Sequence, residues 1–478
     1  MRWRLVGIAA VLSAVALGCT SPGVVRFPPG RGSVVGTAAP DVVGPLAMRG
    51  RDLVDATGRV VLIHGVNSVA KSEPFISPLT DGSLGPADLA SMRADGINGV
   101  RLGVWAAELM PAPGVIDTAY LDAVQVDVNA LTAAGMWVLL DFHQDVFWGM
   151  PTWATTAAAA AKPDVVSPLF SWVGWAASYT TDRSVQQWED WWANTEITPG
   201  HGVQDLFAEG VAAVAGRFAA STNLVGIDLL NEPYAGSRFG DCISAGCPDR
   251  YREVAAMFSR LTAASQAAAP NVPVWWEPLT LGPSFPTVTA PGPGVGLSFH
   301  SYCLDTDGGQ PVAPSPAAVA LCDGLFGSTF DGADALSRRW DTPAMLTEFG
   351  ASQSPLNATG AAREADAHLM SWFHWHGALN YPEVVRTQLV RTYAQATAGE
   401  PNLQRFEPAT GAFELRYTPD HGVTAPTSIV VPAVQYPDGY DVAVSGGSVT
   451  SAANAGRLTV AADPGATEVV VHVTRTTT

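Results

Sequence analysis

The sequence predicts a TIM barrel, that is, a (β/α)8 barrel, followed by a small antiparallel β-sandwich. Between residues 60 and 375, eight apolar runs without polar alternation are separated by segments with helical signals, and such runs are typical of strands buried on both faces. Two of the runs stop abruptly at a glutamate, Glu232 and Glu348. After about residue 384 the runs become short, β-rich and punctuated by Gly, Pro and Asp, which favours a sandwich.

The expected barrel strands alternate with expected helices. The strands are expected at 60–67, 99–103, 137–143, 225–232, 274–277, 295–300, 344–348 and 371–375. Helical signals lie at 86–93, 117–134, 205–220 and 249–269, and three of these four segments are followed closely by Gly or Pro, the usual helix stop signals. This alternation favours a barrel. We assign residues 46–382 to the barrel and 383–478 to the sandwich.

Composition and charge exclude several classes of protein. Of the 478 residues, 47% are hydrophobic and 15% are charged, so the chain is globular with a large core. Because this length exceeds the usual size of one core, a barrel plus a smaller module is expected. The formal net charge of −18 argues against a nucleic-acid partner, since few basic groups are left to neutralise phosphates. A monomer is expected, and no metal or organic cofactor is implied.

The N-terminus has the pattern of an export signal. Arg2 and Arg4 precede an apolar run that ends at Gly18-Cys19, so residues 1–18 are expected to be a secretory signal. The stretch 16–19 also resembles a bacterial lipobox, and two alternatives stay open: a lipid anchor on Cys19, or an ordinary signal cut nearby. Residues 19–45, rich in Pro, Gly, Ser and Val, are expected to form a flexible tether. The protein is therefore expected to be secreted, with or without attachment to the cell envelope.

Four further cysteines, Cys242, Cys247, Cys303 and Cys322, are expected to form two disulfides in an exported chain. Three pairings are possible. We favour Cys242 with Cys247 and Cys303 with Cys322, because each pair closes a short loop. A zinc site is the alternative, but the spacing matches no common zinc signature.

Polar and aromatic residues gather where the expected strands end. Pro233 cannot donate to a sheet ladder, so Asn231 and Glu232 are expected at the last positions of their strand. Active sites of such barrels lie at the carboxyl ends of the strands. The residues found there are Lys71, Asp141, His143, Asn231, Glu232, Glu277, His300, Tyr302, Glu348, Trp372 and Trp375.

The connection from 144 to 204 is long and rich in aromatic residues. Connections of this length in compact domains are usually lids or binding elements. Tryptophan faces stack on sugar rings, and an aromatic patch can contact a lipid. The alternative for each ring is that it forms part of the small core of the insertion itself.

Two carboxyl groups suit the cleavage of a glycosidic bond. This reaction needs a proton for the leaving oxygen and a group that meets the oxocarbenium-like carbon. Glu232 suits the role of acid if burial and the negative charge of Glu348 raise its pKa. Glu348 then remains ionised as the nucleophile. Asn231 would donate a hydrogen bond to the 2-hydroxyl of the sugar, a contact that strengthens in the transition state.

Over residues 50–475 the sequence resembles the retaining enzymes of glycoside hydrolase family 5, and within that family the bacterial endoglycoceramidases. The stretches that carry the resemblance are His64-Gly65-Val66-Asn67 with Lys71, Asp141-Phe142-His143-Gln144-Asp145, Asn231-Glu232-Pro233, His300-Ser301-Tyr302-Cys303, Leu346-Thr347-Glu348-Phe349-Gly350, and residues 390–399. The sequence departs from the family pattern at His374, where Tyr is usual.

The resemblance implies retaining hydrolysis of the β-glycosidic bond between the oligosaccharide and the ceramide of glycosphingolipids, presented in membranes or micelles. It implies Glu232 as acid/base and Glu348 as nucleophile. The residues that would hold the first sugar are Lys71, Asp141, His143, Asn231, His300, Tyr302, and an aromatic ring from Trp372 or Trp375. His143 and His300 have the alternative role of bracing the carboxylates.

Two other functions compete with this one. An endo-β-glucanase or mannanase of the same family would use the same carboxylates on a polysaccharide. A non-catalytic carbohydrate- or lipid-binding protein on a degenerate barrel would have no need of both glutamates.

Overall fold

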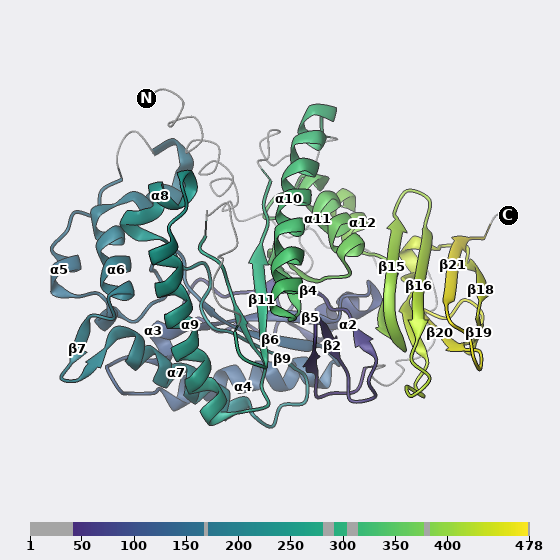
Figure 1. Cartoon of the computed structure of the whole chain (residues 1–478), viewed down its shortest axis with the longest axis horizontal. Helices are drawn as coiled ribbons and strands as arrows, with labels where there is room; N and C mark the ends of the chain where they lie inside the picture. The colour runs from purple at the N-terminus through teal and green to yellow at the C-terminus, as the bar shows by residue number, and fades with distance from the viewer. Residues whose placement is uncertain (1–41, 167–170, 281–290, 304–313, 377–382, 477–478) are drawn as a thin grey trace.

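The computed structural model describes residues 42–166, 171–280, 291–303, 314–376 and 383–476, which form a barrel and a β-rich unit beside it (Figure 1). The expected export signal and nearly all of the expected tether lie outside the described residues. In the ranges that are described, no helix combines the length and apolarity needed to cross a bilayer.

Among the described residues, eight parallel strands close into a barrel, which confirms the predicted fold class. The strands, in the order in which they pair around the barrel, are β4 (His64–Ser68), β5 (Gly99–Trp105), β6 (Trp137–His143), β9 (Leu224–Asp228), β10 (Val274–Trp276), β11 (Val295–His300), β12 (Ala344–Glu348) and β13 (Ser371–His374). Their residues are buried almost throughout, as the continuous apolar runs predicted.

The helices that follow the strands begin and end at recognisable signals. They are α2 (Pro86–Ala94), α3 (Ala106–Leu109), α4 (Thr118–Ala133), α7 (Val203–Phe218), α8 (Phe239–Ser244), α9 (Pro248–Ala268), α10 (Pro316–Trp340), α11 (Pro355–His368) and α12 (Glu383–Leu389). The carboxylate of Asp117 accepts hydrogen bonds from the backbone of Ala119 and Tyr120 at the start of α4, which is a common N-cap. Gly135, with φ of +71°, follows the end of α4, where a left-handed residue often terminates a helix.

Five expected strands differ from the structure at an end, and three of these differences bear on the fold or the site. The run 60–67 is not one strand: β3 (Val60–Val61) belongs to the β-rich unit, and the barrel strand β4 begins only at His64. A continuous apolar run cannot distinguish burial in one sheet from burial in the next. The strands predicted to reach Glu232 and Glu277 end at Asp228 and Trp276, so both glutamates lie on the turns that follow.

The aromatic insertion between β6 and α7 has secondary structure of its own and packs against the barrel core. It contains η1 (Thr152–Ala154), α5 (Ala157–Ala160), η2 (Ser171–Thr180), α6 (Asp182–Trp192), β7 (Glu196–Thr198) and β8 (His201–Gly202). Trp188, Trp191 and Trp192 of α6 are buried in the main core, whereas 48% of Trp148 is exposed. The first three rings are therefore core residues. The side chains of the two tryptophans of η2 lie outside the described residues.

The β-rich unit consists of two antiparallel sheets, which confirms the second part of the predicted fold. One sheet has the order β1-β2-β3-β14-β17-β20-β19 and the other β15-β16-β21-β18. The bounds are β1 (Ala47–Arg49), β2 (Asp52–Val54), β14 (Tyr393–Thr397), β15 (Gly399–Glu407), β16 (Ala412–Pro419), β17 (Thr427–Val430), β18 (Tyr440–Ser445), β19 (Gly447–Val449), β20 (Arg457–Ala462) and β21 (Val469–Arg475), with a 3-10 turn η4 (Ala433–Gln435). The sandwich therefore includes strands from both ends of the described chain.

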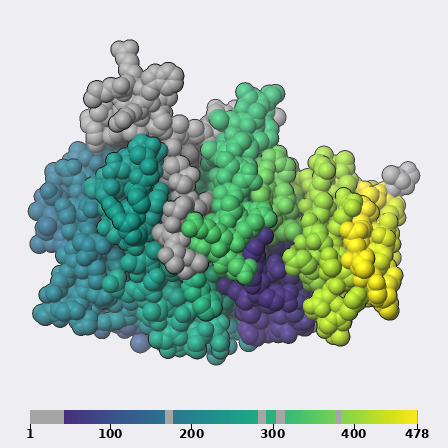
Figure 2. Space-filling model, in the orientation of Figure 1, coloured from purple at the N-terminus to yellow at the C-terminus, as the bar shows by residue number. Residues whose placement is uncertain are grey.

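The N-terminal strands lie between the barrel and the C-terminal strands, as the purple segment in Figure 2 shows. Pairing of β3 with β14 links the two ends of the chain. A buried ion pair between Asp366 of α11 and Arg391 joins the barrel to the sandwich. Gln404 of β15 donates to the other oxygen of Asp366, so these contacts tie the β-rich unit firmly to the barrel wall.

Candidate active site

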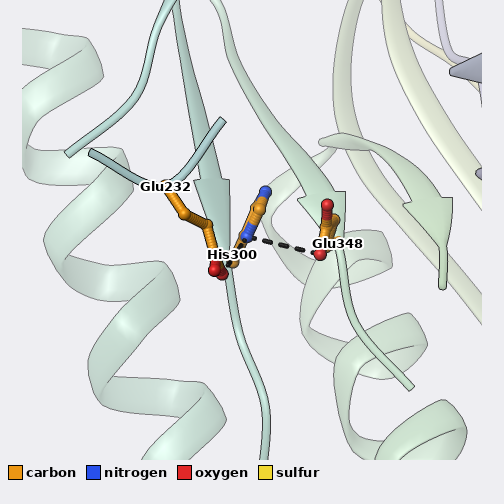
Figure 3. Close-up of side chains that lie close together, drawn as sticks. All are labelled: Glu232, His300 and Glu348. Atoms are coloured by element: carbon orange, nitrogen blue, oxygen red, sulfur yellow. Dashed lines mark hydrogen bonds and ion pairs between the residues drawn. The ribbon is translucent and has the colours of Figure 1, made fainter. Parts of the chain in front are cut away.

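Glu232 and Glu348 face each other across the carboxyl end of the barrel, with His300 between them (Figure 3). Nδ1 of His300 lies 2.8 Å from Oε1 of Glu232 and 3.5 Å from Oε2 of Glu348. One oxygen of each carboxylate and one nitrogen of the ring all lie within 4.8 Å of one another. Retaining glycosidases hold their two carboxyl groups about 5–5.5 Å apart, whereas inverting enzymes need roughly 6.5–9.5 Å. The spacing therefore fits the retaining geometry.

The backbone of Glu232 is held in an unusual conformation. Its φ is +45°, a left-handed value that non-glycine residues adopt rarely and that often marks a functional site. The side-chain amide of Gln144 donates to the carbonyl oxygens of Asn231 and Glu232 at 2.8 and 2.9 Å. Gln144 thus holds the turn that aims Glu232 toward the centre of the barrel.

Burial raises the pKa of Glu232 to about 7, and the carboxylate of Asp145 adds to the effect. The sequence predicted that burial and the charge of Glu348 would raise this pKa, but the neighbouring charge that contributes most is that of Asp145. Only 8% of Glu232 is exposed. A carboxyl group in this state carries a proton at neutral pH for much of the time, as a general acid must.

Glu348 receives donors on both of its oxygens. Nη1 of Arg101 lies 2.6 Å from Oε1, and the hydroxyl of Tyr302 donates to Oε2 at 2.8 Å. Two strong donors, one of them charged, fix the orientation of a carboxylate. The turn after Glu348 requires a glycine, because a Cβ on Gly350 would lie 2.2 Å from Nε2 of His374.

Arg101 of β5 is the centre of the hydrogen-bonded network below the two glutamates, and it is not among the site residues predicted from the sequence. Its guanidinium donates to Asn67 at 3.0 Å, Asp141 at 2.9 Å, Asp228 at 3.0 Å, Asn231 at 2.8 Å and Glu348 at 2.6 Å. It is completely buried. A charged residue in the middle of the apolar run 99–103 was the available signal, because arginine is almost never fully buried unless it is paired.

A second chain of polar contacts runs from Asp141 to the mouth of the barrel. His143 Nδ1 lies 2.7 Å from Oδ2 of Asp141, and its Nε2 lies 3.7 Å from Oδ2 of Asp145. The same oxygen of Asp145 accepts from Lys71 at 2.7 Å. Burial by itself lowers the pKa of His143, but Asp141 and Asp145 together outweigh this effect and raise the pKa to about 9. His143 is therefore a cation at neutral pH.

The structure brings most of the predicted site residues together and separates one. Trp375 stacks on His143, and the Nζ of Lys71 lies 4.6 Å from the centre of its ring. Trp372 is fully buried, stacked on His64 and in edge contact with Phe349. Of the two predicted aromatic rings, Trp375 is thus the one that lies among the polar groups of the site.

The short distances among Glu232, His300 and Glu348 are also those found among ligands of a metal ion. The hydrogen bond between His300 and Glu232 accounts for this spacing without an ion, and burial lowers the pKa of His300 to about 4. We assign no metal to this group of side chains.

The favoured cysteine pairing is present. The described residues contain disulfides between Cys242 and Cys247 and between Cys303 and Cys322. The second disulfide ties the segment just after Tyr302 to the second turn of α10. Disulfides of this kind fit a protein that folds in an oxidising compartment.

Comparison with known protein families gives two matches that together cover most of the chain. The family described as "Cellulase (glycosyl hydrolase family 5)" matches residues 54–380. The family described as "Glycoside hydrolase family 5 C-terminal domain" matches residues 391–474. The second match extends over most of the β-rich unit.

Individual relatives give a consistent result. Endoglycoceramidase I of Rhodococcus hoagii (strain 103S) is 38% identical over 449 residues, which cover 89% of this chain and 87% of that protein. An endoglycoceramidase of Cyanea nozakii is 24% identical over 82% of this chain and 85% of its own. Among solved structures, a ganglioside GM3 complex of endo-glycoceramidase II from Rhodococcus sp. matches with a TM-score of 0.72 at 26% identity, over 88% of this chain and 99% of that one.

Proposed function

This chain belongs to glycoside hydrolase family 5, and from that premise we propose that it is a retaining endoglycosidase that releases the intact oligosaccharide of glycosphingolipids from ceramide. The observation that carries this proposal is the pair of carboxylates, Glu232 and Glu348. One oxygen of each lies, with a nitrogen of the intervening His300, within 4.8 Å of the others. The R. hoagii relative, at 38% identity over most of both chains, supports the choice of substrate class.

In the first step, Glu232 protonates the glycosidic oxygen and Glu348 attacks the anomeric carbon. The bond to the ceramide oxygen breaks, ceramide leaves as an alcohol, and the sugar becomes covalently attached to Glu348. Tyr302 and Arg101, each bonded to one oxygen of Glu348, hold this carboxylate in position for attack. In the second step, the ionised Glu232 takes a proton from water, which displaces the sugar from Glu348 with net retention.

The sugar next to the cleaved bond would be held by groups that already converge on the site. Asn231 uses its oxygen for Arg101 and one amide hydrogen for the carbonyl of Gln144, which leaves its second amide hydrogen for the 2-hydroxyl. Lys71, Asp141 and His143 would contact hydroxyls farther from the bond. Trp375 would stack against the sugar ring.

The lipid part of the substrate must be reached in a membrane or a micelle. Export and, as the finer alternative, a lipid anchor on Cys19 would bring the enzyme to such surfaces; the disulfides support the first of these two. Labelling of the expressed protein with a radioactive fatty acid, compared with a Cys19→Ala variant, tests the anchor. Labelling of the wild type that is lost in the variant would establish it, and no labelling of either would refute it.

The decisive test incubates the purified mature protein with lactosylceramide or a ganglioside in mild detergent, beside a cellodextrin. Mass spectrometry then looks for free ceramide and for the intact oligosaccharide. Release of both from the glycolipid is expected, and Glu348→Gln, which keeps the size of the side chain, should abolish it. Cleavage of the cellodextrin alone would support an endo-β-glucanase and overturn the proposed substrate.

A further inference from the structure

A third carboxylate, Glu277, lies behind the histidine that separates the two glutamates. It follows the last residue of β10 and is 3% exposed. Its Oε1 lies 3.5 Å from Nε2 of His300, on the opposite edge of the ring from Glu232. The imidazole of His300 thus connects two carboxyl groups, Glu277 at Nε2 and Glu232 at Nδ1.

Glu277 and the edge of His300 that faces it each have a buried polar atom without a hydrogen bond. Oε2 of Glu277 and Nε2 of His300 are buried without a hydrogen-bond partner among the described residues, and buried polar atoms in native proteins nearly always have one. A small rotation would bring the two side chains into contact. The reaction proposed above does not use Glu277 at all, so its burial at this position calls for a role.

We propose that Glu277 is a positioning residue that acts through His300, selecting which ring nitrogen carries the hydrogen and so setting the protonation of Glu232 during the reaction. The inference rests on the proposed function, in which Glu232 must be protonated in one step and ionised in the next.

Two arrangements of the same hydrogens show how this works. In the first, Glu277 is protonated and donates to Nε2, while Nδ1 carries a hydrogen that it donates to ionised Glu232. In the second, Nε2 has taken the proton of Glu277, and Nδ1 has passed its hydrogen to Glu232. The charge of the three groups is the same in both, and the proton has moved from one carboxyl to the other through a neutral ring.

The surroundings favour a proton shared within this group of three. Burial raises the pKa of Glu277 well above its ordinary value, and the charges of Asp228 and Glu232 add to it. Burial lowers the pKa of His300 to about 4, so the ring itself is neutral. The other charged or titratable groups that face these three are Arg101 on β5, Asp141 and His143 on β6, Lys71 and Asp145 at the mouth, Tyr179 on η2, Tyr302 after β11, and Glu348 on β12.

The test replaces Glu277 by glutamine, which keeps size and hydrogen bonding but cannot ionise. In the wild type, Glu232 and Glu277 share one proton. This proton must leave while the other carboxylate of the two is already negatively charged. Without that charge, Glu232 should lose its proton at lower pH. The basic limb of the pH profile of kcat/KM is therefore expected to move to lower pH by about half a unit or more. KM should change less than about twofold, because Glu277 is not among the residues proposed to hold the sugar.

A readout without turnover separates this role from a merely structural one. In protein labelled with ¹⁵N-histidine, the two ring nitrogens of His300 report directly which of them carries hydrogen. In the wild type, the ¹⁵N chemical shifts of His300 should change with pH, with the same midpoint as the basic limb of kcat/KM. In Glu277→Gln, both midpoints should move to lower pH together. Glu277→Asp, which keeps the carboxyl, should restore the wild-type midpoint in part.

The control is Asp127→Asn, which removes another carboxyl group whose pKa burial raises to about 7, on α4 outside the barrel. It should leave both the limb and the His300 shifts unchanged. Rates are measured on an aryl β-lactoside whose leaving group is not activated and still needs Glu232 as acid, so that failure on ceramide substrates does not affect the result. Loss of activity in Glu277→Gln with an unmoved limb and unmoved shifts would overturn the inference.

Discussion

Nη1 of Arg101 lies 2.6 Å from Oε1 of Glu348, and both side chains are buried at the bottom of the site. The same guanidinium binds Asp141 and Asp228, so one cation stands among three carboxylates. Arrangements of this kind stabilise a protein only when every charge is paired and hydrogen-bonded. The position of Glu348 therefore depends on Arg101.

Arg101→Lys is expected to damage both stability and activity. Lysine offers a single ammonium group, which cannot reach five acceptors in the plane of a guanidinium. Leaving buried carboxylates unpaired costs about 3–5 kcal/mol, and kcat/KM should fall by about a hundredfold or more because Glu348 is no longer fixed.

Thermal unfolding and kinetics with an aryl β-lactoside measure the two effects. The matched control is Arg183→Lys, because Arg183 pairs with Asp164 at the surface, where both side chains are substantially exposed. Such pairs contribute about 0–1 kcal/mol, so the control should resemble the wild type. Wild-type kcat/KM in Arg101→Lys would contradict the role given to this network.

Gln144→Ala is expected to loosen the turn that carries Glu232. Two buried carbonyl groups lose their side-chain donor, at a cost of about 1–3 kcal/mol. Because the left-handed turn then relaxes, proton donation should suffer more than nucleophilic attack. kcat/KM should fall more for a natural glycolipid than for a substrate with an activated leaving group, which needs little help from an acid.

The comparison for this variant is Gln125→Ala, since Gln125 forms its hydrogen bonds in the described part of the chain with the exposed side chains of Asn129 and Arg217. Equal losses of kcat/KM on the two substrates in Gln144→Ala would show that Gln144 supports the fold in general rather than Glu232 in particular.

Glu232→Gln is expected to stabilise the protein at alkaline pH while it slows catalysis. Burial raises the pKa of Glu232 from the ordinary value of 4.5 to about 7, so the folded chain holds this proton more tightly than the unfolded chain. Stability then falls as pH rises from about 4.5 through about 7, because the buried carboxyl must ionise. Glutamine removes this penalty, which is on the order of 1–3 kcal/mol at pH 8.

Thermal unfolding at pH 4.5 and pH 8 tests the sign of this effect. The melting temperature of Glu232→Gln should exceed that of the wild type at pH 8 and approach it at pH 4.5. Glu196→Gln, a change at an exposed position of β7, is the control and should shift neither value. A Glu232→Gln variant that is less stable at pH 8 would show that ionised Glu232 is stabilised by its neighbours.

The two disulfides allow a paired experiment on the site. Cys303 and Cys322 are 19 residues apart, and Cys242 and Cys247 only 5. Loop-closure entropy gives about 3 kcal/mol for the longer loop and about 2 kcal/mol for the shorter one. Replacing Cys303 and Cys322 by serine should therefore lower the melting temperature more than replacing Cys242 and Cys247 by serine.

Activity should separate these two disulfide variants further. Cys303 follows Tyr302, whose hydroxyl donates to Glu348, so loss of the 303–322 bond should also lower kcat. Loss of the 242–247 bond should leave kcat near that of the wild type, with both proteins assayed well below their melting temperatures. Equal kcat values in the two variants would show that Tyr302 is positioned without the disulfide.

Much of the fold was readable from the sequence because buried parallel strands leave a local signature. The eight apolar runs match the eight barrel strands. The short β-rich runs beyond residue 384 match strands of the antiparallel sheets. The prediction of one strand at residues 60–67 was wrong, because these residues belong to two different sheets. Hydrophobicity alone does not indicate which sheet buries a side chain. Pairing of β3 with β14, which lies more than 300 residues later in the chain, has no local signal at all.

The sequence by itself determined the residue types of the site, since Glu232 and Glu348 each follow an apolar run and had to meet at one end of a barrel. Only the tertiary structure decided their roles relative to their neighbours. Arg101, Gln144 and Glu277 come from different strands and turns, and closure of the barrel brings them within hydrogen-bonding or ion-pair distance of groups far away in the chain. The charge and orientation of a buried carboxyl depend on such neighbours, because little water is present to screen them.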